Sequence, residues 1–481
     1  MQPFNGFLNT TCQHDRRTAL LETARVIEPQ KTSHTRLLTS PETVSEQVVP
    51  VGVAPQRGAP RVPLRLTAVV SRLTGANVLG AAAAFITGPL LARALGASGR
   101  GDLAAIIVPV TLAAYVLGLG LPTYANRELP RGRPVGVVVG SVGALLIAVG
   151  AMAALAAVPV ADALAGGRGV VRTCLIVGFL CMPLFLLGTL FYSSVAGLQR
   201  WRAVIAMRLI PIGVTTVAFV GLSIAGHLTV ASAAAFSLLG ALLALVPAAP
   251  MLTEAGRPVF RAAVAREGLV FGLKTWLGTL ALLGNVRLDQ FLMITVVSPR
   301  ELGLYAVAVT LASASSLLIT GITPPLFARV SHGESELLPR VLRVSLALTV
   351  LLNIGLAVVT PVLLPALFGP EFSDAVPMAL ILLVAAVPFT GAAVLSAGLQ
   401  ADGAPAISSM AEGIALVVTV AGLAVALGPL GGIGAALVSL ASYSASFVFQ
   451  LVAIHRRHSD TPLHRYVFPT AADVRWARSL V

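Results

Sequence analysis

Apolar runs of about 20 residues recur along almost the whole chain, and this feature limits the possible fold more than any other. Val135–Val158, Leu228–Leu252 and Ala406–Leu427 are examples, and they contain almost no charged residues. Twenty residues of helix rise roughly 30 Å, which is the thickness of the hydrocarbon core of a bilayer. Because the runs lack the period-2 alternation of a membrane β-barrel, they predict transmembrane helices.

The composition excludes a soluble fold. Of 481 residues, 56% are hydrophobic and 11% are charged, whereas soluble domains carry about 25% charged residues. We expect an all-α polytopic membrane protein of about twelve transmembrane helices. The predicted spans are residues 72–95, 102–125, 135–158, 171–196, 203–224, 228–252, 269–297, 302–327, 342–368, 376–398, 406–427 and 430–454.

The two ends of the chain differ from the rest. Residues 1–65 are polar and rich in Thr, Pro and Ser, with no apolar core of the kind that marks a signal peptide. This composition predicts a disordered cytoplasmic tail. Residues 456–481 form a second, basic tail, and residues 253–267 form a short polar linker in the middle of the chain.

The arginine distribution predicts the orientation. With a cytoplasmic N-terminus, the inside segments hold most arginines of the loops and tails, and the outside loops hold mainly Arg100, Arg168 and Arg300. Because positive charge gathers in cytoplasmic loops, both termini are expected on the cytoplasmic side of the cell membrane. The same rule accounts for the net charge of +13. No basic patch is interleaved with aromatic residues, so no nucleic-acid partner is predicted.

An internal repeat divides the spans into two sets of six. Gly101, Pro122 and Arg127 recur 202 residues later as Gly303, Pro324 and Arg329, and residues 196–199 (Ala-Gly-Leu-Gln) recur at 397–400. Since six helices are an even number, the two halves have the same orientation, which makes a parallel repeat about an axis along the membrane normal. We predict bundles at residues 66–252 and 268–455 that rock about a central site.

Phrases in the second half resemble a known family. They are Arg287-Leu288-Asp289-Gln290-Phe291-Leu292, then residues 301–308 (Glu-Leu-Gly-Leu-Tyr-Ala-Val-Ala), and finally residues 324–329, together with Gly197-Leu198-Gln199 in the first half. They are similar to the polysaccharide flippases of the multidrug/oligosaccharidyl-lipid/polysaccharide exporter superfamily. The resemblance covers roughly residues 68–455. It implies a flippase for undecaprenyl-diphosphate-linked oligosaccharides that acts in surface polysaccharide assembly, alongside other assembly proteins.

Three other functions compete with this interpretation. Lipid II flippases of the same superfamily usually have fourteen helices and a more basic cavity, and this chain has no room for two more spans. A cation-coupled multidrug exporter would need acidic and aromatic cavity residues, whereas only 6% of the residues are aromatic. A membrane polysaccharide polymerase would need a large outer loop with catalytic groups. All predicted outer loops are short, and no catalytic, cofactor-binding or metal-binding motif occurs.

Charged residues inside the predicted spans are candidates for function, because a charge at mid-bilayer costs several kcal/mol. Arg208 and Glu412 lie at similar depth on repeat-related helices. We predict that both face the central cavity, where Arg208 attracts a diphosphate or acidic sugar and Glu412 titrates or balances that charge. The alternative is a helix–helix contact that serves packing only.

Asp289 and Asn77 complete the predicted site. Asp289, like Glu412, is a candidate to take a coupling proton or sodium ion; the alternative is a structural ion pair or a place near the outer interface. Arg287 lies two residues before it, and this spacing predicts that the two side chains point to different faces of a regular helix. Asn77, in the first span, is predicted to line the cavity.

Overall fold

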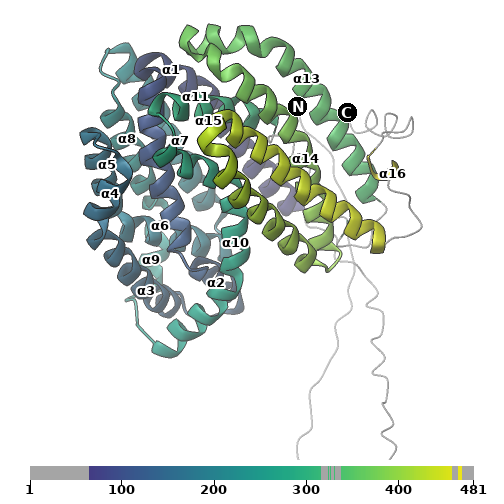
Figure 1. Ribbon diagram of the computed structural model, residues 1–481. Coiled ribbons are helices and arrows are strands. Elements are labelled where there is room, and N and C mark those ends of the chain that lie inside the picture. Colours follow the sequence, from purple (N-terminus) through teal and green to yellow (C-terminus); the bar gives the residue numbers. More distant parts are fainter. Residues whose placement is uncertain are drawn as a thin grey trace, which may run out of the picture. The chain divides into compact units, whose positions relative to one another are not determined.

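The structure, a computed structural model, describes residues 64–315, 337–457 and 464–467 together with Thr323, Leu326 and Val330. In this part of the chain every regular element is a helix (Figure 1). The predicted disordered tail lies almost wholly outside the described residues. So do Pro324, Pro325 and Arg329 and most of the basic C-terminal tail.

Before the linker, the described residues of the first half form nine α-helices and two short 3₁₀ helices. They are α1 (Leu64–Val116), α2 (Leu121–Glu128), η1 (Leu129–Arg131), α3 (Val135–Leu155), α4 (Ala157–Ala165), α5 (Gly169–Leu180), α6 (Met182–Gly197), α7 (Trp201–Ile224), α8 (Val230–Leu243), η2 (Val246–Ala248) and α9 (Ala249–Ala255).

The described helices of the second half begin after the linker. They are α10 (Ala262–Val296), α11 (Pro299–Ala312), η3 (Ser313–Ser315), α13 (Leu337–Phe368), η4 (Pro370–Ala375), α14 (Val376–Ala401), α15 (Pro405–Arg457) and α16 (His464–Val467).

The long helices confirm a multi-span membrane protein of about twelve helices. Seven helices of the described part are long and apolar enough to cross a bilayer, or eight with the bent pair α5–α6. Two of the seven spans, of 43 and 53 residues, are far too long for one crossing of roughly 30 Å. Gly96 (φ 67°) interrupts α1 and Gly431 (φ 52°) interrupts α15. Glycine readily adopts this left-handed conformation, so each long helix makes two spans.

Several spans predicted as continuous helices are interrupted, and the fourth and the second are the clearest cases. The fourth bends by 52° between α5 and α6, where Cys181 caps the end of α5 and Pro183 is the second residue of α6. Proline lacks a backbone N–H and is accommodated without loss of a hydrogen bond in the first turn of a helix, so Pro183 favours a new helix start here. The second span stops at Val116 and resumes at Leu121 as α2.

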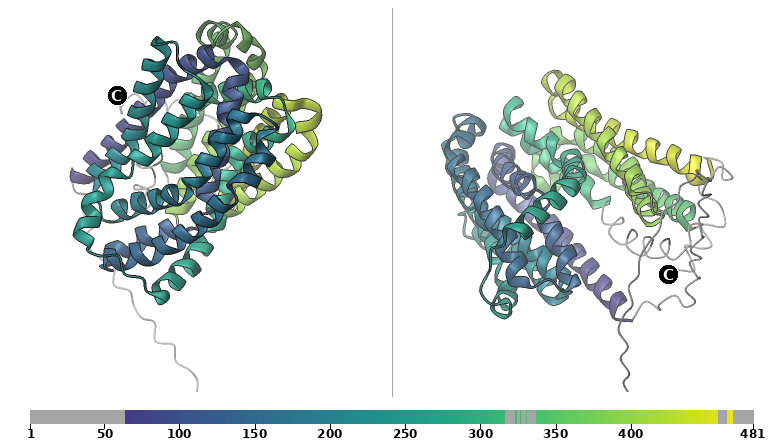
Figure 2. Two further views of the ribbon diagram at one scale, coloured as in Figure 1. Left: turned by 90° about the vertical axis from the view of Figure 1, so that its left-hand side faces the viewer. Right: turned by 90° about the horizontal axis from the view of Figure 1, so that it is seen from below.

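Helices α3–α9 (blue to teal) lie on one side and α13–α15 (green to yellow) on the other, with α10 between them (Figures 1 and 2). Helix α10 packs against α2 and α3 and also against α15. Its N-terminal half contacts the first set, since Gly268 lies against Tyr124 and Gly272 lies against the backbone of Leu119. Helix α10 therefore links the two halves, whose boundaries at 66–252 and 268–455 stay a prediction.

A second contact between the halves joins two glycines that the internal repeat relates. Gly101 on α1 and Gly303 on α11 face each other. A Cβ on Gly101 would lie 3.1 Å from the Gly303 nitrogen, and a Cβ on Gly303 would lie 2.9 Å from the Gly101 nitrogen. Either Cβ would overlap a carbonyl oxygen of the other helix, that of Pro299 or of Ala97. The two helices thus meet backbone to backbone at the end predicted to be outer.

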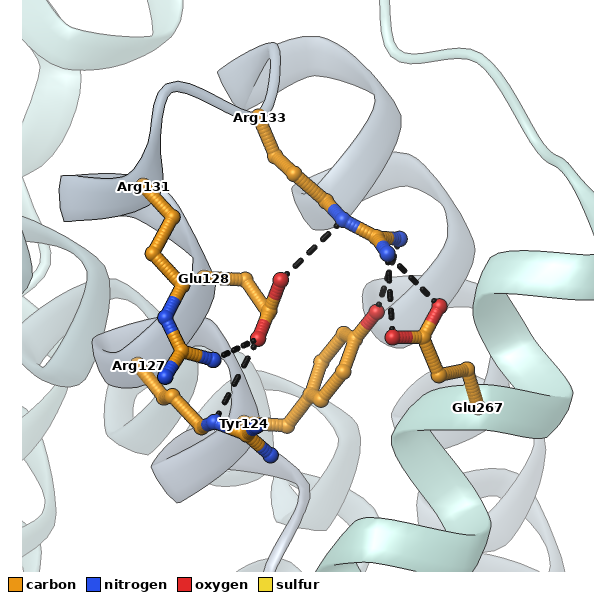
Figure 3. Close-up of polar contacts among 6 residues, drawn as sticks. All are labelled: Tyr124, Arg127, Glu128, Arg131, Arg133 and Glu267. Atoms are coloured by element: carbon orange, nitrogen blue, oxygen red, sulfur yellow. Dashed lines mark hydrogen bonds and ion pairs between the residues drawn. The ribbon is translucent and has the colours of Figure 1, made fainter. Parts of the chain in front are cut away.

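An ion-pair network holds the opposite end together (Figure 3). Glu128 is 5% exposed and pairs with Arg131 at 2.8 Å and with Arg133 at 3.1 Å. Arg133 also donates to the Tyr124 hydroxyl at 3.1 Å and to Glu267 on α10 at 2.9 Å. The hydrogen bond with Glu267 raises the pKa of the Arg133 guanidinium. The network therefore ties the α2–α3 loop to the start of α10.

We predict that Glu128→Gln lowers the free energy of unfolding by about 2–3 kcal/mol, because it leaves clustered arginines without their buried counter-charge. The apparent Tm of the detergent-solubilised protein measures this effect. Glu254→Gln is the control: its side chain is 61% exposed beside Arg200, and loss of an exposed pair costs at most about 1 kcal/mol. Equal Tm values for the two variants would contradict the prediction.

Candidate functional site

A cavity of about 730 Å³ lies among the helices of the first half. Its walls come from the part of α1 that follows Gly96 (the second arm of α1; the part before Gly96 is the first arm), from α2, α6, α7 and α8, and from Trp276 of α10. The volume is in the range of sites for organic ligands. In the described part of the chain 22 residues line the cavity: five carry an aliphatic hydroxyl group and four are aromatic, while none is acidic and one, Arg208, is basic.

Arg208 is an exposed side chain on this cavity wall. No carboxylate lies within ion-pair distance of it in the described part of the chain. By contrast, Arg131 pairs with Glu128, Arg168 with Asp102 and Arg300 with Asp374. A guanidinium that carries a full charge and has donors to spare attracts phosphate or carboxylate groups. The cavity is therefore suited to an anionic ligand.

Three of the five aliphatic hydroxyl groups of the wall already donate their protons to backbone carbonyls. Thr111 donates to the Ile107 carbonyl at 2.7 Å, Thr189 to Leu186 at 2.7 Å, and Ser237 to Ala233 at 2.8 Å. A hydroxyl oxygen that donates in this way still has lone pairs to accept a hydrogen bond. The wall thus offers acceptors to a ligand that carries its own hydroxyl groups.

The break between α1 and α2 opens onto the same cavity. Gly118, Gly120 and Pro122 line it, and Leu119 has a positive φ of 49°, which is uncommon for a residue with a Cβ. The Trp276 Nε1 donates to the Val116 carbonyl at 2.8 Å and so satisfies a group that the break leaves free. Irregular backbone at membrane depth occurs where it is buried in protein or lines a cavity, and in transporters it marks binding sites.

A polar cluster lies between α10 and α15 in the second half. The Asn285 Nδ2 donates to the Glu412 carboxylate at 2.8 Å. Thr419 donates to the Ser442 hydroxyl at 2.8 Å, and its own oxygen lies 3.4 Å from the Asn285 Oδ1. Glu412 is half-buried and has no cation within ion-pair distance among the described residues. It is not among the residues that line the Arg208 cavity, and its predicted role stays a prediction.

Asp289 is the more deeply buried carboxylate, with 6% of its surface exposed. It accepts a hydrogen bond from the Tyr305 hydroxyl and one from the Gln290 backbone at 2.6 Å. Arg287 is exposed and donates to the Gln290 side chain at 3.3 Å, so the predicted difference in direction between Arg287 and Asp289 is confirmed. An ionised carboxylate in this place would need a cation, which makes Asp289 a candidate to take up a proton or a metal ion.

The predicted residues therefore fall into separate places. Arg208 lines the first-half cavity, Asp289 and Glu412 belong to the polar groups around α10, and Asn77 is half-buried on the first arm of α1 without lining that cavity. No local sequence pattern links Tyr305 with Asp289, Asn285 with Glu412 or Trp276 with the break after Val116. Gly118-Leu119-Gly120-Leu121-Pro122 is a turn signal that could have located the break.

The fold is that of known membrane transporters. An inward-facing multidrug resistance MATE family transporter of the MOP superfamily matches with a TM-score of 0.65 at 14% identity, over 82% of this chain and 100% of that chain. The lipid II flippase MurJ in an inward closed conformation matches with a TM-score of 0.69 at 12% identity, over 83% of this chain and 89% of that chain. The MATE multidrug transporter DinF-BH in complex with R6G matches with a TM-score of 0.59 at 13% identity, over 85% of this chain and 97% of that chain.

At these identities the likeness shows the fold alone. No curated protein sequence matches the chain. A family model described as polysaccharide biosynthesis protein matches residues 90–377, which is more than half of the chain. The resemblance that the sequence phrases carry is thereby confirmed: the chain belongs to the polysaccharide biosynthesis protein family and has the fold of the MOP superfamily transporters.

Proposed function

We propose that the protein flips an undecaprenyl-diphosphate-linked oligosaccharide from the inner to the outer leaflet of the cell membrane, for surface polysaccharide assembly, and is not an enzyme. Arg208 carries this proposal. It is the one charged residue on the wall of the cavity and has no acidic partner among the described residues. Membership of the polysaccharide biosynthesis family supports the same substrate class.

In this mechanism the head group enters the hydrated cavity from the cytoplasmic side while the polyprenyl tail stays in lipid. Arg208 draws the diphosphate in through charge-assisted hydrogen bonds, and acceptor oxygens such as that of Thr189 bind the sugar hydroxyl groups. The two bundles then rock, so that the Gly101–Gly303 contact opens and the inner end closes. Both termini stay on the cytoplasmic side.

Uptake of a proton or sodium ion at Asp289 or Glu412, down its gradient across the membrane, supplies the free energy that drives flipping. Neither carboxylate has a cationic partner within ion-pair distance in the described part, and both face polar groups of α10, α11 or α15. Binding of a proton or sodium ion removes the cost of a bare charge in the membrane. Because α10 contacts both sets of helices, a movement of α10 caused by cation binding at Asp289 also moves the wall of the first-half cavity.

A multidrug exporter is the second candidate, because the matched structures include a MATE multidrug transporter in complex with R6G. The aromatic residues of the cavity suit flat organic molecules. The unpaired charge of Arg208 opposes a cationic drug and favours an anionic lipid, which ranks the flippase first.

Flipping of a fluorescent undecaprenyl-diphosphate disaccharide in reconstituted vesicles tests the proposal. Arg208→Ala is expected to lower the flipping rate at least tenfold, since a charge-assisted phosphate contact is worth about 1.5–3 kcal/mol. Arg208→Lys keeps the charge and is expected to retain part of the rate. Arg202→Ala is the control, because Arg202 lies on the same helix but does not line the cavity. An unchanged rate for Arg208→Ala would refute the proposed role.

A further inference from the structure

The Arg208 cavity is unusually rich in aromatic residues. Tyr115 on α1, Phe185 and Tyr192 on α6 and Trp276 on α10 make four of its 22 lining residues, whereas aromatic residues are 6% of the chain. Tyr115 is 51% exposed and Tyr192 is 37% exposed. These rings are therefore open to a ligand, unlike Tyr124 and Tyr305, which are fully buried.

Each of the two tyrosines lies beside a threonine on the same helix face. Thr111 and Tyr115 are four residues apart, and Thr189 and Tyr192 are three residues apart, which are the spacings of neighbours on a helix surface. All four residues line the cavity. Each tyrosine thus places a ring face and a phenol group next to an acceptor oxygen.

The Trp276 ring is fixed in orientation. Its only N–H donates to the Val116 carbonyl at the break in the second span, so the indole has no further hydrogen bond to give. It contributes an aromatic face that is held in place. A rigid ring loses little conformational entropy when a ligand stacks on it.

The charges of the wall restrict what can stack there. Among the 22 lining residues none is acidic and only Arg208 is basic. If Arg208 binds the diphosphate, the described residues of the wall offer no second cation for an acidic sugar and no carboxylate for a basic one. The apolar face of an uncharged pyranose, with C–H groups on the ring face and hydroxyl groups at its edge, matches rings flanked by acceptor oxygens.

We propose that Tyr115, Tyr192 and Trp276 form a saccharide subsite beside Arg208 that binds the uncharged sugars of the head group. The proposal rests on the proposed flippase function and adds its sugar class. A cationic aromatic drug would also stack on these rings, but it would meet the repulsion of Arg208 with no compensating carboxylate among the lining residues that the structure describes.

Fluorescence of Trp276 reports directly on this subsite. The chain has three tryptophans, and replacing Trp201 and Trp476 with phenylalanine leaves Trp276 as the sole emitter. The full-length protein in detergent is titrated with farnesyl diphosphate, with farnesyl diphosphate carrying a neutral disaccharide, with the same lipid carrying a glucuronic-acid disaccharide, and with rhodamine 6G.

The neutral disaccharide is expected to tighten binding about tenfold over farnesyl diphosphate and to quench Trp276, since each ring contact adds a modest stacking energy. The double variant Tyr115→Leu/Tyr192→Leu should lose this gain but keep the affinity for farnesyl diphosphate. Tyr115→Phe/Tyr192→Phe keeps the rings and should keep most of the gain. Phe260→Leu, at an exposed phenylalanine that does not line the cavity, should change nothing.

The four titrations distinguish failure of the saccharide subsite from failure of the proposed flippase function. Equal affinities with and without the neutral disaccharide, or a gain that survives in the leucine variant, would overturn the subsite. A glucuronic-acid disaccharide that binds as tightly as the neutral one would overturn the proposed sugar class. If Arg208→Gln leaves the affinity for farnesyl diphosphate unchanged, the flippase proposal fails. Rhodamine 6G that binds more tightly than all three lipids would point to drug export and overturn both.

Discussion

Gly101→Ala adds a single methyl group and is expected to lower the flipping rate by roughly 10- to 100-fold. The new Cβ would overlap the Pro299 carbonyl oxygen of α11 and lie 3.1 Å from the Gly303 nitrogen. Both of these are backbone atoms at the start of a helix and cannot rotate away as a side chain can. Overpacking of this kind costs about 1–3 kcal/mol, and the cost falls only on the state in which α1 and α11 touch.

The substitution therefore acts on an equilibrium between conformations. A bias of 1.4 kcal/mol changes the ratio of two conformations about tenfold. The protein carrying Gly101→Ala should open at the outer end and be slow to return to the state that accepts substrate from inside. Gly303→Ala should have the same effect, because its Cβ would overlap the Ala97 carbonyl oxygen.

Distances between spin labels measure this shift. Labels on Gly169→Cys and Ser373→Cys, in a background without the native cysteines, report on the separation of the two halves at the end predicted to be outer. We expect a longer distance in Gly101→Ala and no change in Gly221→Ala, since a Cβ on Gly221 meets nothing within 4 Å. A distance distribution identical to that of the wild type would show that the glycine contact does not control closure.

Asp289→Asn is expected to abolish the response of flipping to an imposed cation gradient. The amide keeps the shape of the side chain and can still accept the hydrogen bond from Tyr305, but it takes up no proton and has no negative charge to balance a bound cation. A potential of 100 mV supplies roughly 2.3 kcal/mol for each charge that crosses. Loss of one coupled charge therefore lowers the ratio of lipid in the outer leaflet to lipid in the inner leaflet that this potential can maintain by about 50-fold.

Vesicles with imposed proton or sodium gradients provide the measurement. The wild type should flip the fluorescent lipid faster with one of the two gradients, and Asp289→Asn should flip it at the same slow rate with and without it. Asp374→Asn is the control, because that side chain is 59% exposed in an ion pair with Arg300. If Asp289→Asn retains the gradient response and Glu412→Gln loses it, coupling belongs to Glu412.

The number of spans and the fold class could be predicted from the sequence, because the number of consecutive apolar residues in a segment decides whether it can cross a bilayer as a helix. The repeat offset also located Gly101 and Gly303 as equivalent positions, and the structure shows why both lack a side chain. Two such positions can touch each other only at the axis that relates the two halves.

The interiors of the bundles could not be predicted in the same way. Hydropathy gives no direction around a helix that is apolar on all sides, so Arg208 and Glu412 looked equivalent although only Arg208 lines the cavity. Partners such as Asn285 and Glu412 are 127 residues apart, and no local pattern links them. The break at Val116–Leu121 was missed because the residues within it are still largely apolar.

Lipid-linked sugars extracted from a strain that lacks this gene test the central claim most directly. We predict that an undecaprenyl-diphosphate oligosaccharide accumulates while a surface polysaccharide disappears, that the wild-type gene reverses both changes, and that the Arg208→Ala gene does not. Normal levels of lipid-linked sugars together with an intact surface polysaccharide would contradict the flippase function and favour the drug exporter.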